Sequence, residues 1–142
     1  MYSKALIVSA VALAASLALG ASASAEVVKM KADLTSASEV PPTTSPGKGT
    51  ADVTYDTASK KLTWKVIYSG LTGPATMAHF HGPAAVGANA APAVPIPDPK
   101  SGAEGSATLT DAQAADLMAG KYYVNFHTDA NKGGEIRGQV TK

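Results

Sequence analysis

The 142-residue sequence contains no cysteine, which excludes disulfide cross-links, thiolate metal centres and attachment of a lipid to an N-terminal cysteine. Aromatic side chains are also few, with one Trp, two Phe and five Tyr, so the core is modest and suits one domain. The 12 basic and 11 acidic residues nearly cancel, leaving a formal net charge of +1. Without an excess of cations to neutralise phosphates, nucleic acid is not an expected partner.

The first 25 residues have the layout of a secretory signal peptide. Lys4 precedes an uncharged, mostly apolar run over residues 5–19, and small residues up to Ala25 follow it. This run is shorter than the roughly 18 to 20 apolar residues of a membrane-spanning helix, which argues against an uncleaved anchor. We therefore predict a signal peptide over residues 1–25, cleaved after Ala25 or alternatively after Ala23. The mature domain, residues 26–142, would be periplasmic or secreted, with no membrane partner after cleavage.

Short apolar segments separated by glycine and proline favour strands over helices. A single helix is expected over residues 111–119, because Thr110 and Gln113 have capping-box spacing and Gly120 suits the end of a helix. Residues 82–105 contain five prolines and no clear periodicity, which indicates a long loop. We predict an all-β Greek-key β-sandwich with one short helix, whose strands cover residues 27–34, 50–55, 61–68, 75–81, 106–109, 121–127 and 135–141.

Two of the three histidines, His79 and His81, are separated by one residue on a predicted strand. Because side chains alternate along a strand, both imidazoles project from one face, with Cα atoms about 6 to 7 Å apart. His127 ends another predicted strand and supplies a third nitrogen if the two strands are neighbours. Imidazoles without thiolates suit copper(II) or zinc, and copper is the tighter-binding of the two. We predict a mononuclear copper site with zinc as the alternative; otherwise these are exposed strand residues that bind no metal.

Other polar residues near this histidine set are candidates for supporting roles, and none is predicted to be catalytic. Met77 shares the face of His79 and His81, so its thioether is either a weak extra ligand for copper(I) or a packed side chain. Arg137 would attract an anion to the metal. A carboxylate from Glu135, Asp129 or Glu39 would orient a ligand imidazole by accepting its second N–H. The alternative for the Asp129, Glu135 and Arg137 group is a set of surface charges.

Several segments together resemble the CHRD domain, a module first named from chordin. They are LTSASEVPP from Leu34, HFHGPA from His79, YVNFHT from Tyr123 and GGEIRGQ from Gly133. The resemblance covers most of residues 28–141. Members of this family occur as repeats in extracellular animal proteins and as single exported bacterial domains, and this chain is similar to the latter. The resemblance therefore implies an exported domain, with no settled activity.

The order of the histidines is also distantly similar to copper/zinc superoxide dismutase. That similarity implies a dismutase-like or immunoglobulin-like sandwich, with His79, His81 and His127 as copper ligands and Arg137 as the arginine that guides the substrate anion. Residues 82–105 contain no histidine, so the bridging ligand and the zinc site of that family are absent. The similarity therefore implies a copper site with a single metal ion.

Three functions remain open from the sequence. The first is an exported copper carrier, buffer or redox site, whose partner is the metal ion. The second is a metal-free adhesion or protein-interaction module, with structural histidines and residues 82–105 as its contact surface for a protein partner. The third is superoxide dismutation, which would require a reaction rate that depends on Arg137.

Overall fold

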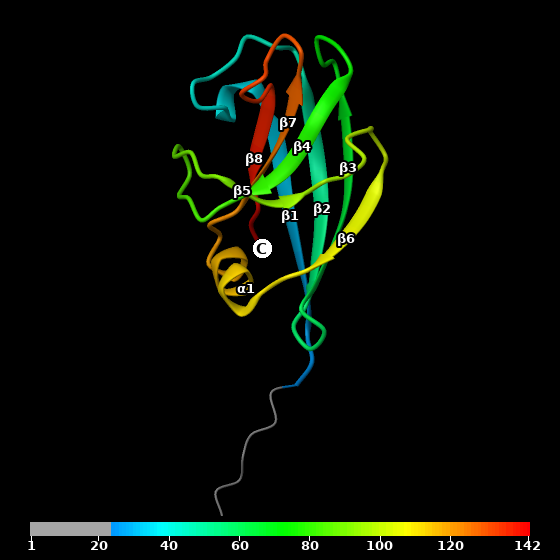
Figure 1. Cartoon of the computed structure of the whole chain (residues 1–142), viewed down its shortest axis with the longest axis vertical. Coiled ribbons are helices and arrows are strands. Elements are labelled where there is room, and N and C mark those ends of the chain that lie inside the picture. Colours follow the sequence, from blue (N-terminus) through cyan, green and yellow to red (C-terminus); the bar gives the residue numbers. More distant parts are fainter. Residues whose placement is uncertain (1–23) are drawn as a thin grey trace, which may run out of the picture.

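A computed structural model describes residues 24–142 of the chain, so the predicted signal peptide lies almost entirely outside the described residues. Eight antiparallel strands and one α-helix make up the domain (Figure 1), which confirms the expected all-β class with one short helix. The elements are β1 (Val27–Thr35), the 3-10 turn η1 (Ser36–Ser38), β2 (Lys48–Asp56), β3 (Lys61–Ser69), β4 (Ala75–His81), β5 (Pro92–Pro95), β6 (Glu104–Thr108), α1 (Asp111–Met118), β7 (Tyr123–Thr128) and β8 (Ile136–Gln139).

The strands form one sheet in the order β5-β4-β7-β8-β1-β2-β3-β6, and this sheet folds over so that its two halves face each other. Trp64 on β3 packs edge-on against Phe80 on β4, with ring centroids 5.2 Å apart, although these two strands are not neighbours in the sheet. Tyr68 on β3 likewise contacts Phe126 on β7, at 5.0 Å. Cross-sheet contacts of this kind make a sandwich, with the apolar core between its halves.

Alternation along each strand supplies the core. The inward positions of β3 are Leu62, Trp64 and Val66, and their intervening neighbours point outward, as period-two patterning requires. The same pattern holds on β1 and β2, and on β4 the core positions are Ala78 and Phe80. The core is therefore one apolar cluster shared by both halves, which includes Leu34, Val53, Leu62, Trp64, Val66, Phe80, Leu117, Tyr122, Val124, Phe126 and Ile136.

The two halves are joined along a narrow seam between β1 and β8. Thr35 pairs with Arg137, and Lys31 and Thr141 form an isolated bridge with backbone hydrogen bonds of 2.8 and 2.9 Å. The chain crosses from one half to the other after β3, β5 and β6. Such crossings are what a Greek-key organisation requires.

Residues 82–105 are more ordered than a single long loop. Within them, β5 pairs with β4, with Phe80 opposite Val94, and β6 begins at Glu104 beside β3. The prediction of one continuous loop was therefore wrong, because backbone pairing to an edge strand requires no apolar periodicity. The capping box of α1 is confirmed, with the Thr110 side chain accepting from Gln113 N and the Gln113 side chain accepting from Thr110 N.

One consequence of this order is that β4, β7 and β8 lie side by side. His79 pairs with Asn125, and Asn125 also pairs with Arg137. The outer face of these three strands thus carries a continuous polar row, which the 82–91 and 39–44 segments border. No helix within residues 24–142 is long and apolar enough to cross a membrane.

Candidate metal centre

The three histidines form one cluster on the polar face of β4 and β7. One ring nitrogen from each of His79, His81 and His127 lies within 4.8 Å of the others. His79 Nδ1 and His127 Nε2 are 3.3 Å apart, which is about the separation of two nitrogens bound to one metal ion at ~2.05 Å with a tetrahedral angle. The neighbouring strands on which the prediction depended are confirmed, because β4 pairs directly with β7.

Backbone carbonyls fix which ring nitrogens face the cluster. His81 Nδ1 lies 2.9 Å from the Ala90 carbonyl, and His127 Nδ1 lies 2.8 Å from the Lys132 carbonyl. A carbonyl only accepts, so each Nδ1 carries the proton and each Nε2 keeps its lone pair. His81 Nε2 is buried and has no hydrogen-bond partner among the described residues. A buried, unpartnered nitrogen of this kind is available to a metal ion or a water molecule.

The local environment favours neutral imidazoles. Burial, followed by the positive charges that His127 and His81 can carry, lowers the pKa of His79 below its ordinary value. Burial is also the main reason why the pKa of His81 is lowered, against the opposing effect of the hydrogen bond to Ala90. Neutral imidazoles are the form that binds metal, so the lowered pKa values of His79 and His81 favour metal binding.

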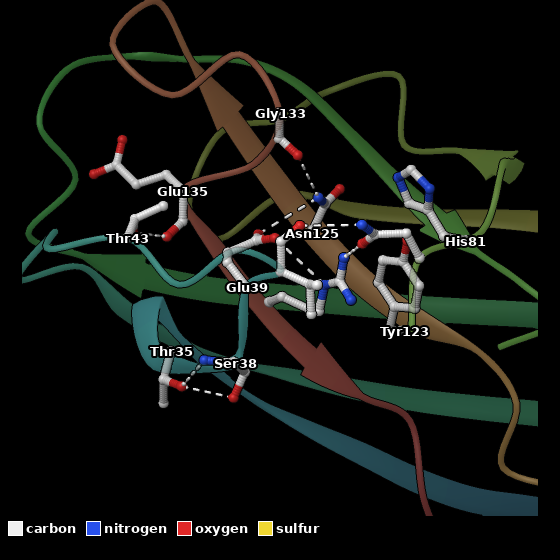
Figure 2. Close-up of polar contacts among 12 residues, drawn as sticks. Thr35, Ser38, Glu39, Thr43, His81, Tyr123, Asn125, Gly133 and Glu135 are labelled. Atoms are coloured by element: carbon white, nitrogen blue, oxygen red, sulfur yellow. Dashed lines mark hydrogen bonds and ion pairs between the residues drawn. The ribbon is translucent and has the colours of Figure 1, made fainter. Parts of the chain in front are cut away.

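His81 stacks on the ring of Tyr123, which in turn stacks on the guanidinium of Arg137. The Tyr123 ring lies parallel to the His81 ring, with an interplanar angle of 6° and centroids 4.8 Å apart. The Arg137 guanidinium carbon lies 3.8 Å from the centroid of Tyr123, a cation–π distance. The His81 and Tyr123 side chains are both labelled in Figure 2.

Behind the stack, Glu39 is buried against Arg137 and Asn125. Glu39 Oε2 lies 3.3 Å from Arg137 Nε, close enough for an ion pair, although the N–H is not aligned for a hydrogen bond. Asn125 Nδ2 donates to Glu39 Oε1 at 3.4 Å and to the Gly133 carbonyl at 3.5 Å (Figure 2). Burial raises the pKa of Glu39, and the positive charge of Arg137 opposes that rise. Glu39 is therefore the counter-ion of Arg137, and it does not orient a ligand imidazole through a hydrogen bond.

Residues 30–140, which include all three histidines, match one family model, that of the CHRD domain. The chain belongs to the CHRD domain family. No curated protein and no solved structure gives a significant match. The resemblance to CHRD domains is thus confirmed, and it makes an extracellular or secreted β-domain the expected setting for the three histidines.

In this CHRD domain the remaining candidate residues lie apart from the cluster or at its edge. The Glu135 carboxylate points away from His81 (Figure 2) and accepts hydrogen bonds from Ser45, Thr72 and Thr128. Asp129 is exposed in the turn after β7. Met77 is opposite His127 in the strand register and is 50% exposed. Of these three, only Met77 lies on the open side of the cluster.

Sequence reasoning missed the groups that orient the imidazoles. Tyr123 and Asn125 share the outward face of β7 with His127, so the period-two pattern placed them beside the site without revealing a role. The carbonyls of Ala90 and Lys132 have no sequence signal, because every residue carries one. These two backbone acceptors take the place that a carboxylate was expected to fill in this CHRD domain.

Proposed function

We propose that this CHRD domain is an exported copper-binding protein that holds one copper ion at His79, His81 and His127 and serves as a carrier, a buffer or a redox site. The observation that carries the proposal is the convergence of three imidazole nitrogens with two of the rings held by backbone carbonyls. A set of three nitrogen ligands favours copper(II) over zinc at equal availability. A periplasmic or secreted location follows from the predicted signal peptide and from the family.

A fourth ligand would reach the bound ion from the exposed side of the site. His81 and His127 are each only 7% exposed, whereas His79 is partly exposed and Met77 is half exposed. The open side of the site therefore faces solvent past β4, where a water molecule or the Met77 thioether can approach a bound ion. A site open on one side suits uptake and release of copper. It also permits redox chemistry at the ion.

Calorimetric titration of residues 24–142 with Cu(II) and Zn(II) tests the proposal. We expect one Cu(II) ion per chain and weaker Zn(II) binding. His79→Ala should weaken Cu(II) binding by about 100-fold or more, since losing an outer-shell partner alone typically costs 10- to 100-fold. Asp129→Asn, which changes an exposed residue of the same region, is the matched control and should leave the affinity unchanged.

Three outcomes would contradict or change this proposal. Equal Cu(II) affinity in the wild type and in His79→Ala would place any binding elsewhere. Absence of binding for both metals would favour a metal-free interaction module, with residues 82–105 as its contact surface. Tighter Zn(II) than Cu(II) binding would retain the site and change its metal.

A further inference from the structure

The segment Ala88–Ala90 is attached to the metal centre more tightly than an exposed loop requires. The Ala90 backbone makes three hydrogen bonds: its carbonyl accepts from His81 Nδ1 at 2.9 Å and from the Tyr123 hydroxyl at 3.2 Å, and its N–H donates to that hydroxyl at 3.1 Å. The position of the Ala90 carbonyl therefore sets both the tautomer and the tilt of His81.

Arg137 holds the other end of the same segment. Its Nη1 donates to the Ala88 carbonyl at 3.1 Å, and its Nη2 donates to the Asn89 side-chain oxygen. Asn89 in turn donates from Nδ2 to the Val40 carbonyl at 3.1 Å, beside Glu39. One guanidinium thus ties the loop after β4 to β8 and to the segment after η1.

The guanidinium also fixes Tyr123 by stacking on its ring. Arg137 is 5% exposed, pairs with Glu39, and has Ala88, Asn89 and the Tyr123 ring as its other neighbours. The Nη1 and Nη2 donors of Arg137 point toward the loop. The dismutase similarity had implied a different role, in which Arg137 attracts an anion to the metal. Only the planar guanidinium group of arginine can contact all of these partners at once.

We propose that Arg137 is a positioning residue: by holding Ala88–Ala90 and Tyr123, it keeps His81 as the Nδ1–H tautomer with Nε2 directed at the metal. This inference rests on the proposed metal site for its functional meaning. The orientation of His81 is nevertheless a property of the metal-free protein and can be measured in it.

The test uses three variants of residues 24–142. Arg137→Lys keeps the charge beside Glu39 and removes the fork, while Asn89→Ala removes one acceptor from an exposed position and leaves the core intact. Val86→Ala, on the same loop and 80% exposed, is the control. Long-range ¹H–¹⁵N NMR spectra of the metal-free proteins report the His81 tautomer, and competition with a chelator of known affinity reports Cu(II) binding.

We expect a single Nδ1–H tautomer of His81 in the wild type and in Val86→Ala, and a mixture of tautomers in Arg137→Lys and Asn89→Ala. Cu(II) affinity should fall about 10- to 100-fold in Arg137→Lys and by about tenfold in Asn89→Ala, the range for outer-shell partners of a ligand histidine. A single tautomer with unchanged affinity in both variants would overturn the inference. If the wild type binds no copper, the proposed function fails, and the tautomer alone decides on the role of Arg137.

Discussion

His79 Nδ1 lies 3.3 Å from His127 Nε2, across neighbouring strands and 48 positions apart in the chain. Because His127 donates its own Nδ1–H to the Lys132 carbonyl, its Nε2 is the acceptor in this contact and His79 Nδ1 carries the proton. In the metal-free protein, therefore, a hydrogen bond closes part of the site. A metal ion that enters between the two nitrogens must replace this proton.

Metal binding should move the proton of His79 from Nδ1 to Nε2, on the solvent side of the ring. Zn(II) is a suitable diamagnetic probe, and long-range ¹H–¹⁵N NMR spectra before and after its addition measure the change. The tautomers of His81 and His127 should stay the same, since their Nδ1–H groups remain bound to carbonyls. An unchanged His79 spectrum at saturation would show that His79 is not a ligand through Nδ1.

Replacing Met77 by leucine should weaken Cu(I) binding and leave Cu(II) binding nearly unchanged. A thioether is a soft ligand that prefers Cu(I), and Met77 lies opposite His127 on the open side of the cluster. The expected loss is about tenfold in Cu(I) affinity, or about 1.4 kcal/mol. Competition with a Cu(I)-specific chromophoric chelator measures it. Met118→Leu, on helix α1, serves as the control, and equal Cu(I) affinities in the two variants would remove Met77 from the site.

Glu135 should make the stability of the domain fall steeply in acid. Burial raises the pKa of this carboxylate, but hydrogen bonds from Ser45, Thr128 and Thr72 outweigh that effect and bring the pKa to about 2 from an ordinary 4.5. The folded pKa is below the unfolded one, so the stabilisation is present above about pH 4.5 and is lost as the pH falls toward 2. The difference corresponds to about 3 kcal/mol.

Urea denaturation of the wild type and of Glu135→Gln at pH 7 and pH 3 measures this contribution. The glutamine amide presents a donor to neighbours that are themselves donors, so we expect the variant to lose about 3 kcal/mol at pH 7 and to depend less on pH. Asp129→Asn should follow the wild type. Parallel pH dependences in the wild type and in Glu135→Gln would show that the network does not stabilise the ionised carboxylate.

Gly138→Ala should destabilise the seam between β1 and β8. A Cβ atom at this position would meet the Asp33 backbone, with the carbonyl carbon at 2.7 Å, and backbone cannot move aside without separating the two strands. We expect a loss of about 1 to 3 kcal/mol in thermal or urea unfolding. Gly73→Ala has open space around the new methyl group and should change stability by less than about 0.5 kcal/mol. Similar stabilities for the two variants would show that the seam can widen without loss.

Period-two patterning was sufficient to predict most of the strands and the common face of His79 and His81. The local capping signal of Thr110 and Gln113 likewise placed α1. The pairing of β4 with β7 could not be predicted from this periodicity, because strand order depends on which faces of distant segments pack together. From the sequence, His127 could join the site only if its strand lay beside that of His79 and His81. The structure shows that these two strands are neighbours.

The supporting groups were harder to predict, for a different physical reason. Glu39, Glu135 and Arg137 were all recognised as polar residues near the site, but charge alone does not say which partner a side chain meets. Glu39 pairs with Arg137, and Glu135 ties together three other segments. Except for the contact between Thr128 and Glu135, their roles depend on contacts between residues about 50 to 100 positions apart, which no local pattern contains.

The Ala90 and Lys132 carbonyls that orient His81 and His127 belong to the main chain. Side chains at positions 90 and 132 can therefore change without altering the acceptors, provided that the two loops keep their path. Related chains can then diverge widely in these loops and still present the same three nitrogens. A search for such sites that demands an acidic partner beside each histidine would pass over this protein, whereas one that compares backbone paths would find it.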